Sequence, residues 1–173
     1  MPEKRCNIGE FRGAFWPTAE QLKPYFFNQP SDLFDGGNDS WGLHIFGLHG
    51  TEKLADIERI NVALHIDIRS DLGTNFTYRL WDGRLGDAFY FHSKGDLTRR
   101  LEFIKTSHGS LLSAGLFIPF VAAWRAVKEF IETDGELPKA IEWISSTDLP
   151  SDTFPDLGDR KAIQKLKDEN RIR

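Results

Sequence analysis

Residues 60–69 alternate between apolar and polar side chains along their whole length. Successive side chains of a β-strand point to opposite faces of a sheet, so this alternation predicts a strand with one buried face. A sheet with one covered and one solvated face is typically antiparallel. The apolar positions are Ile60, Val62, Leu64, Ile66 and Ile68, and the alternate positions are Asn61, Ala63, His65, Asp67 and Arg69.

Five further segments are expected to join this strand in one sheet. They cover residues 41–48, 75–81, 88–92, 100–105 and 140–145. Turn residues separate them, and the pair Asp82-Gly83 is a strong hairpin signal. The apolar residues around 100–105 also fit a helical spacing, so a helix stays open as an alternative there. The sequence therefore predicts an antiparallel sheet of about five or six strands.

The segment 116–144, LFIPFVAAWRAVKEFIETDGELPKAIEWI, has the features of one amphipathic helix that leads into a strand. Pro119 suits the start of a helix, Gly135 suits the left-handed residue after its end, and Pro138 suits the exit. Apolar residues recur between them at helical spacing, which predicts a main helix over about 119–134 packed on one face of the sheet. These apolar positions are Phe120, Trp124, Val127 and Ile131.

Short helices are expected near both ends of the chain. Thr18 and Gln21 form a capping-box pattern, and Pro24 limits the helix that follows. The charged C-terminal stretch favours a short peripheral helix. We therefore predict one α+β domain over residues 1–150, followed by a charged tail or peripheral helix over 151–173.

The composition is that of a soluble globular protein. Of the 173 residues, 40% are hydrophobic and 28% are charged. No apolar run approaches the ~18 residues of a membrane span, and no signal-peptide pattern is visible. The net charge of −4 provides no global basic field for nucleic acid. We therefore expect a cytoplasmic protein that binds neither nucleic acid nor membrane directly.

The single cysteine, Cys6, excludes an intrachain disulfide framework and a cysteine-based zinc motif. It lies near a terminus that we expect to be mobile, and no activating partner is visible, so an ordinary thiol is expected. The glycine spacings of a phosphate-binding loop or a dinucleotide fingerprint are absent, so no cofactor is expected.

Acidic residues are concentrated between residues 28 and 72. This stretch contains eight acidic and three basic residues, which gives it a net charge of −5. Either the acids form a solvated surface or they attract a basic partner. Trp41 lies near Asp39, and Trp81 lies next to Asp82, which suits a surface that binds a protein. A core aromatic residue next to a turn carboxylate gives the same pattern, so that alternative stays open.

His65 and Asp67 are the strongest candidates for chemistry. They share a face of the predicted strand and could form an acid–base pair or part of a metal site. No second cluster of histidines has a spacing that would complete a metal shell, and an exposed or hydrogen-bonded strand pair is the favoured explanation of the two residues. Ser110 follows His108 by two positions, which is too little to indicate a nucleophile.

One segment also resembles a known family. The stretch FIPFVAAWRAVKEFIETDGELPKAIEW resembles the C-terminal signature of an Imm-type immunity protein family from bacterial polymorphic toxin systems. That signature runs from Ile-Pro through an Ala-rich helix ending in Glu-Phe, then to Gly, Pro, an apolar residue and Trp. The matching residues are Ile118, Pro119, Ala126, Glu129, Phe130, Gly135, Pro138, Ile141 and Trp143.

The resemblance implies a small α+β protein that inhibits one toxin domain by stoichiometric binding, without catalysis. Many toxins of such systems, which include contact-dependent inhibition, are nucleases or deaminases with basic substrate grooves. An acidic surface would complement such a groove and speed encounter. On this hypothesis we expect the toxin to contact Asp32, Asp35, Asp39, Trp41, Asp67, Asp71 and Asp82.

Two other functions stay open from the sequence. One is a small metal-dependent hydrolase that uses His65 and Asp67. The other is an adaptor module whose partner is not a toxin.

Overall fold

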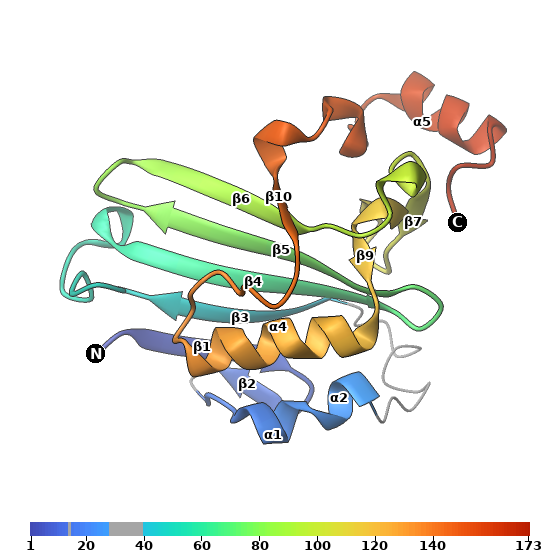
Figure 1. Cartoon of the computed structure of the whole chain (residues 1–173). Coiled ribbons are helices and arrows are strands. Elements are labelled where there is room, and N and C mark those ends of the chain that lie inside the picture. Colours follow the sequence, from blue (N-terminus) through green and yellow to red (C-terminus); the bar gives the residue numbers. More distant parts are fainter. Residues whose placement is uncertain (14, 28–39) are drawn as a thin grey trace.

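The computed structural model describes residues 1–13, 15–27 and 40–173. Its central feature is one antiparallel sheet in the order β10-β6-β5-β4-β3-β1-β2, with β9 paired to β5 (Figure 1). The strands are β1 (Glu3–Ile8), β2 (Phe11–Gly13), β3 (Ser40–Phe46), β4 (Ile60–Arg69), β5 (Gly73–Asp82), β6 (Asp87–Ser93), β9 (Phe117–Ile118) and β10 (Trp143–Ser145). A separate small hairpin pairs β7 (Phe103–Lys105) with β8 (Leu111–Ser113).

Helices and 3-10 turns surround this sheet. The α-helices are α1 (Ala19–Leu22), α2 (Pro24–Phe27), α4 (Phe120–Glu132) and α5 (Arg160–Asp168). The 3-10 turns are η1 (Asp56–Glu58), η2 (Leu97–Arg99), η3 (Ala114–Leu116), η4 (Ser146–Asp148) and η5 (Ser151–Thr153). The expected α+β class with a mostly antiparallel sheet is therefore confirmed.

The expected number of strands is wrong, because the main sheet has eight. Strand β1 was missed since its sequence, EKRCNI, places charged residues at both kinds of position and only Cys6 and Ile8 are deeply buried. Strand β9 has only two residues, which is too short for a periodicity. In the 100–105 segment, residues 103–105 form strand β7 and residues 100–102 follow the 3-10 turn η2, which ends at Arg99. The strand is therefore confirmed for the second half, and no helix forms in this segment.

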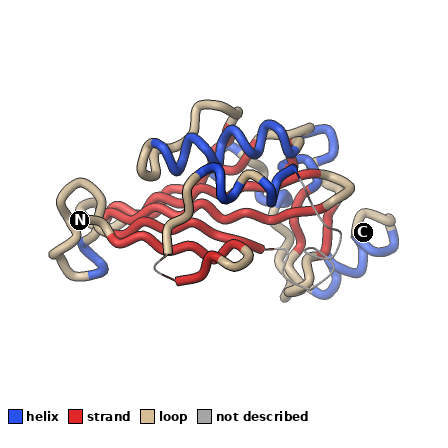
Figure 2. The backbone as a smooth tube through the Cα atoms, turned by 90° about the horizontal axis from the view of Figure 1, so that it is seen from below, coloured by secondary structure: helices blue, strands red, loops and turns tan. Residues whose placement is uncertain are grey.

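The expected main helix is confirmed as α4, and it lies along one face of the sheet (Figure 2). Pro119 has extended backbone immediately before the helix, and Gly135 takes a φ of 95° after it. The helix buries Ala123, Trp124 and Phe130. Phe130 meets the ring of Tyr78 on β5, and Trp124 packs against Phe26 of α2. Burial of this apolar stripe, rather than intrinsic propensity, supplies most of the stability of such a helix.

The face of the sheet under α4, called here the covered face, is a continuous apolar core. Phe76 is fully buried, and Tyr78 is 5% exposed. The Tyr78 hydroxyl donates a hydrogen bond to the Gly135 carbonyl at 2.8 Å, which ties the end of the helix to the central strand β5. Further strand residues of this face are Cys6, Ile8, Leu43, Ile45, Val62, Leu64, Ile66 and Ile68.

The expectation of a mobile N-terminus around Cys6 is wrong. Cys6 lies in β1, pairs with Leu43 of β3, and is 2% exposed. Burial raises the pKa of the Cys6 thiol. Cys6 therefore acts as a small core residue and not as a surface thiol.

The C-terminal stretch packs against the small hairpin at one end of the sheet (Figure 1). The Phe103 amide donates to the Arg171 carbonyl at 2.6 Å, and the Arg173 amide donates to the Phe103 carbonyl at 2.9 Å. Helix α5 itself buries no residue. Backbone pairing with Phe103 thus fixes this end of the chain, and Ile163 and Leu166 of α5 are half-buried.

Candidate functional site

The second face of the sheet carries the side chains that alternate with the core positions. Register places Arg5, His44, Ala63, Arg79 and Tyr90 side by side across five strands. Within the described residues, no helix lies along the middle of this face (Figure 2). We call it the open face and define it as Glu3, Arg5, His44, Phe46, Asn61, Ala63, His65, Thr77, Arg79, Trp81 and Tyr90.

Two separate hollows lie at the ends of the open face. At one end, a hollow of about 220 Å³ lies between Arg5, Phe46 and the turn η1. At the other end, a hollow of about 230 Å³ lies between His65 and the β7–β8 hairpin. A protein surface with a convex element would fit between these two ends.

Two arginines on the open face rest on aromatic rings. The Arg5 guanidinium carbon lies 5.6 Å from the Phe46 ring centroid. The Arg79 guanidinium carbon lies 6.0 Å from the Tyr90 ring centroid, and Arg79 Nε donates to the Tyr90 hydroxyl at 3.2 Å. These contacts hold the cationic groups in place above a rigid sheet, which lowers the entropy lost on binding.

Two histidines lie between the arginines. The rings of His44 and His65 meet edge to face with their centroids 5.3 Å apart. Burial lowers the pKa of both rings, and the positive charge of Arg79 lowers the pKa of each further. Gly42 leaves room for this arrangement, since a Cβ atom there would lie 2.7 Å from His44 Nε2.

Exposed apolar side chains border the open face beside turn η1. Trp81 Nε1 donates to the Ile57 carbonyl at 3.1 Å, so the turn is fixed against the sheet. Ile57 is 70% exposed, and Leu85 in the β5–β6 hairpin is 69% exposed. Apolar and aromatic groups next to fixed arginines are the composition found at the centres of protein interfaces.

The predicted acidic contact residues do not form one patch in the described structure. Asp32, Asp35 and Asp39 lie outside the described residues. Asp71 follows one end of the β4–β5 ladder and Asp82 closes the other, about 30 Å away at ~3.3 Å per residue.

Ion pairs already engage two of these acids. Asp71 pairs with Arg69 at 3.0 Å, and hydrogen bonding from Arg69 lowers its pKa. Asp82 is 8% exposed and pairs with Arg84 at 2.8 Å; hydrogen bonding from Arg84 lowers the pKa of Asp82 to about 2. Their negative charges are therefore largely neutralised by neighbours, and the turn carboxylate beside Trp81 has a structural partner.

Trp41 belongs to the covered face and not to a binding surface. It is 4% exposed, and its ring meets Tyr25 edge to face at 5.5 Å. The contact role expected for Trp41 does not fit this burial. Of the predicted set, Asp67 is the described residue that borders the open face, in the hollow beside His65.

The sequence analysis missed Arg5, Phe46, Arg79 and Tyr90. The signal was present in the strand 75–81, where Arg79 falls between apolar positions. The apolar positions of that strand indicate the core, and Arg79 lies at one of the alternate positions on its other face. Arginine and aromatic residues are enriched at protein interfaces, whereas Lys and Ser are depleted there. Their presence at these alternate positions therefore favours a binding face.

The hollow that contains His65 and Asp67 also includes His108 and Ser110. Within the part of the chain that the structure describes, no three His, Cys, Asp or Glu side chains are arranged to hold a metal ion. The geometry therefore adds no support to the hydrolase hypothesis.

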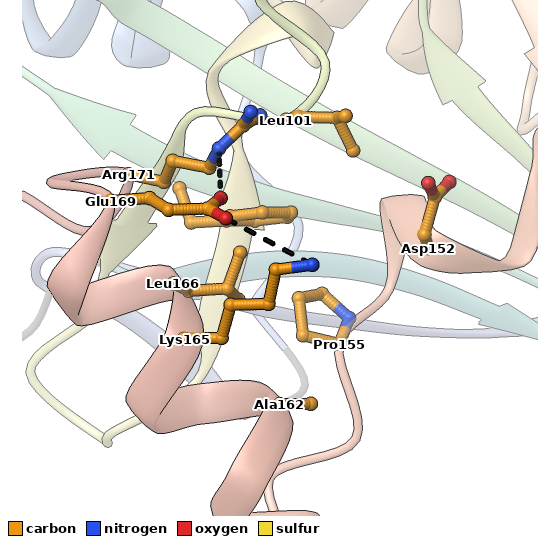
Figure 3. A pocket seen from close by; sticks show the side chains of 9 residues that line it. Leu101, Asp152, Pro155, Ala162, Lys165, Leu166, Glu169 and Arg171 are labelled. Atoms are coloured by element: carbon orange, nitrogen blue, oxygen red, sulfur yellow. Dashed lines mark ion pairs between the residues drawn. The ribbon is translucent and has the colours of Figure 1, made fainter.

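A further hollow of about 340 Å³ lies between α5 and β7 (Figure 3). Its floor includes Phe103 and Leu166. Glu169 at its rim pairs with Lys165 at 3.9 Å and with Arg171 at 2.7 Å. Asp152, which also lines the hollow, is paired with Arg100, so each charged side chain of the lining already has an ion-pair partner.

Comparison with known proteins gives one match. The model of a family described as Immunity protein Imm1 matches residues 37–145, which is 109 of the 173 residues. The matched range contains strands β3 to β10 and helix α4. No curated protein and no solved structure matches the chain. Among the described helices, none has the length and apolar character needed to span a membrane.

Proposed function

This chain belongs to the Imm1 family of immunity proteins, and on that premise we propose that it binds and neutralises a cognate bacterial toxin domain. The observation that carries the proposal is the family match, which covers most of the sheet and its helix. Inhibition is by stoichiometric binding that covers the toxin's active site or an adjacent surface, without catalysis by this chain. The toxin is a nuclease or a deaminase.

The open face supports a protein as the partner. It spans five strands, or about 20 Å at ~4.8 Å per strand. Such a width exceeds most small molecules and suits the centre of a protein interface. Its side chains stand on a sheet that the covered face and α4 hold rigid, so little ordering is needed when a partner binds.

The net charge of −4 favours a basic toxin at long range, because unlike net charges speed diffusional encounter. The acidic stretch around Asp32, Asp35 and Asp39 would contribute to this attraction. A variant with all three changed to Lys is expected to lower the association rate with the toxin several-fold at low salt, with a smaller effect at 0.5 M salt. Equal rates for the variant and the natural chain would remove these residues from the interface and from steering.

The experiment that tests the function uses the toxin encoded next to this chain's gene. Its C-terminal domain is expressed in a bacterial host with and without this chain, and survival is counted. Purified proteins are then mixed, and the mass of the complex is measured by light scattering after size exclusion. We expect protection and a complex of fixed stoichiometry; a toxic domain that this chain neither binds nor neutralises would contradict the proposal.

A further inference from the structure

We propose that the open face is the toxin-contacting surface and that it receives an acidic patch of the toxin, with a carboxylate bound by Arg79. This inference rests on the proposed function and adds to it which surface is used and the chemistry that the partner must present.

The first argument is the cationic group of Arg79 near the centre of the open face. Arg79 forms no ion pair with any described residue; its Nε bonds the neutral Tyr90 hydroxyl. A guanidinium has five N–H donors in a planar fork that matches a carboxylate, so most of this donor capacity remains for a partner. A carboxylate in line with Arg79 would form a charge-assisted, bidentate pair.

The described acids at the η1 end of this face already have partners. Glu3 is paired with Arg5 at 2.6 Å, so these two charges balance each other. Asp56, beside the hollow at η1, is paired with Arg59 at 2.8 Å. Arg79 therefore remains a cation that no described carboxylate pairs with, near the middle of the central strands. Contact with a like-charged, basic patch would be repulsive here, which selects against it.

The second argument is the aromatic content of the same surface. Tyr90 is 40% exposed, and Phe46 and Trp81 are half-buried. Trp, Tyr and Arg are the residues most enriched among those that dominate binding energy in protein interfaces. The rings flank the arginines, so they would exclude water from the ion pairs and strengthen them.

The acidic patch and a basic toxin are compatible. Overall charge acts over distances of about a Debye length, whereas pairing within the interface depends on the groups in contact. A toxin that is basic overall can still carry a local acidic patch. The net negative charge of this chain would attract such a toxin at long range, and the open face would bind the patch.

The test measures the affinity of the purified toxin domain for the full chain by biolayer interferometry. Arg79→Glu reverses the charge at the centre of the face, and Arg5→Glu does so at a more exposed position. Arg125→Glu is the matched control, because Arg125 is exposed on α4, the helix that covers the opposite face. Circular dichroism and thermal melting establish that each variant is folded.

We expect Arg79→Glu to raise the Kd at least about 30-fold and Arg5→Glu to raise it at least about fivefold, with Arg125→Glu within about twofold of the natural chain. Equal Kd values for all three folded variants would overturn the inference. Tighter binding by Arg79→Glu would also overturn it, since that result places a basic patch against the open face. If the natural chain binds no toxin, the proposed function itself fails, and that result is seen before any variant is measured.

Discussion

The two faces of the central sheet use the same strands for different purposes. On the covered face, Phe76, Tyr78 and their neighbours pack under α4 and are almost fully buried. On the open face, Thr77 and Arg79 alternate with them along the same strand. Neighbouring residues of β5 therefore lie in different environments. One side chain enters the apolar core, and the next lies on a polar and aromatic surface that contains Arg79. The contrast indicates that stability resides mainly on one face and recognition on the other.

We expect the largest change in unfolding free energy when a buried aromatic ring is removed from the covered face. Phe130 on α4 is fully buried and meets the Tyr78 ring edge to face at 6.2 Å. Phe130→Ala leaves a cavity and is expected to lower the free energy of unfolding by about 3–5 kcal/mol. Val121→Ala, at a position of the same helix that is 52% exposed, should change it by less than about 0.5 kcal/mol. Urea unfolding of both variants measures this, and similar losses would contradict the assignment of the core.

His92 lies on the open-face side of the sheet, but other residues cover it. Its ring lies on the same side of β6 as Tyr90, but Ser146 Oγ contacts its Nε2 at 2.8 Å and Phe154 covers it at 4.9 Å. Burial lowers the pKa of His92 to about 4, from an ordinary value of 6.5.

The unfolded chain therefore binds a proton at His92 between pH 6.5 and about 4, whereas the folded chain does not. Stability from this group is complete above pH 6.5 and is lost as the pH falls toward 4, by roughly 2–3 kcal/mol. We expect His92→Gln to reduce the loss of stability between pH 7 and pH 4.5 by about that amount in urea titrations. An unchanged pH dependence would show that His92 is not sealed.

A matched pair of hydroxyl deletions compares the faces directly. Tyr78→Phe removes the donor to the buried Gly135 carbonyl and is expected to cost about 1–2 kcal/mol of unfolding free energy. Tyr90→Phe removes the acceptor for Arg79 on the open face, where water can replace it, and should cost less than about 0.5 kcal/mol. Equal costs would contradict the distinction between the faces. Thermal and urea unfolding supply both values.

The smallest expected change in stability is at Arg79 itself. Arg79→Ala removes a side chain that no described carboxylate pairs with, so the free energy of unfolding should change by less than about 0.5 kcal/mol. The same variant should weaken binding to the toxin domain, because the guanidinium is lost from the interface. A large loss of stability would show that Arg79 supports the fold. That result would contradict the assignment of stability mainly to the covered face.

Much of the covered face could be predicted from the sequence. The alternation over β4 and the helical spacing of α4 are local patterns, and the structure reproduces both. The capping box of α1 was likewise predicted and is formed, with the Gln21 amide donating to Thr18 Oγ1. These features follow from burial and from contacts within a few residues, which a single sequence displays.

The residues of the open face could not be predicted from local sequence patterns in the same way. Arg5 and Arg79 are far apart in the chain, and only the register of β1, β3, β4 and β5 places them on one surface. The acidic residues were easier to see because they cluster in sequence, although Asp82 is paired with its neighbour Arg84. Of the described acids in that set, Asp71 and Asp82 lie at opposite ends of the β4–β5 ladder, so closeness in sequence did not place these two side by side.

Hydroxyl-radical footprinting of the chain, free and bound to its toxin domain, tests the central claim most directly. It reports the solvent exposure of individual aromatic and aliphatic side chains. On the open face, Tyr90 and Phe46 should become protected in the complex, whereas Val121 on α4 should be oxidised at the same rate in both states. Protection of Val121 with no change at Tyr90 would place the toxin over the helix and contradict the account.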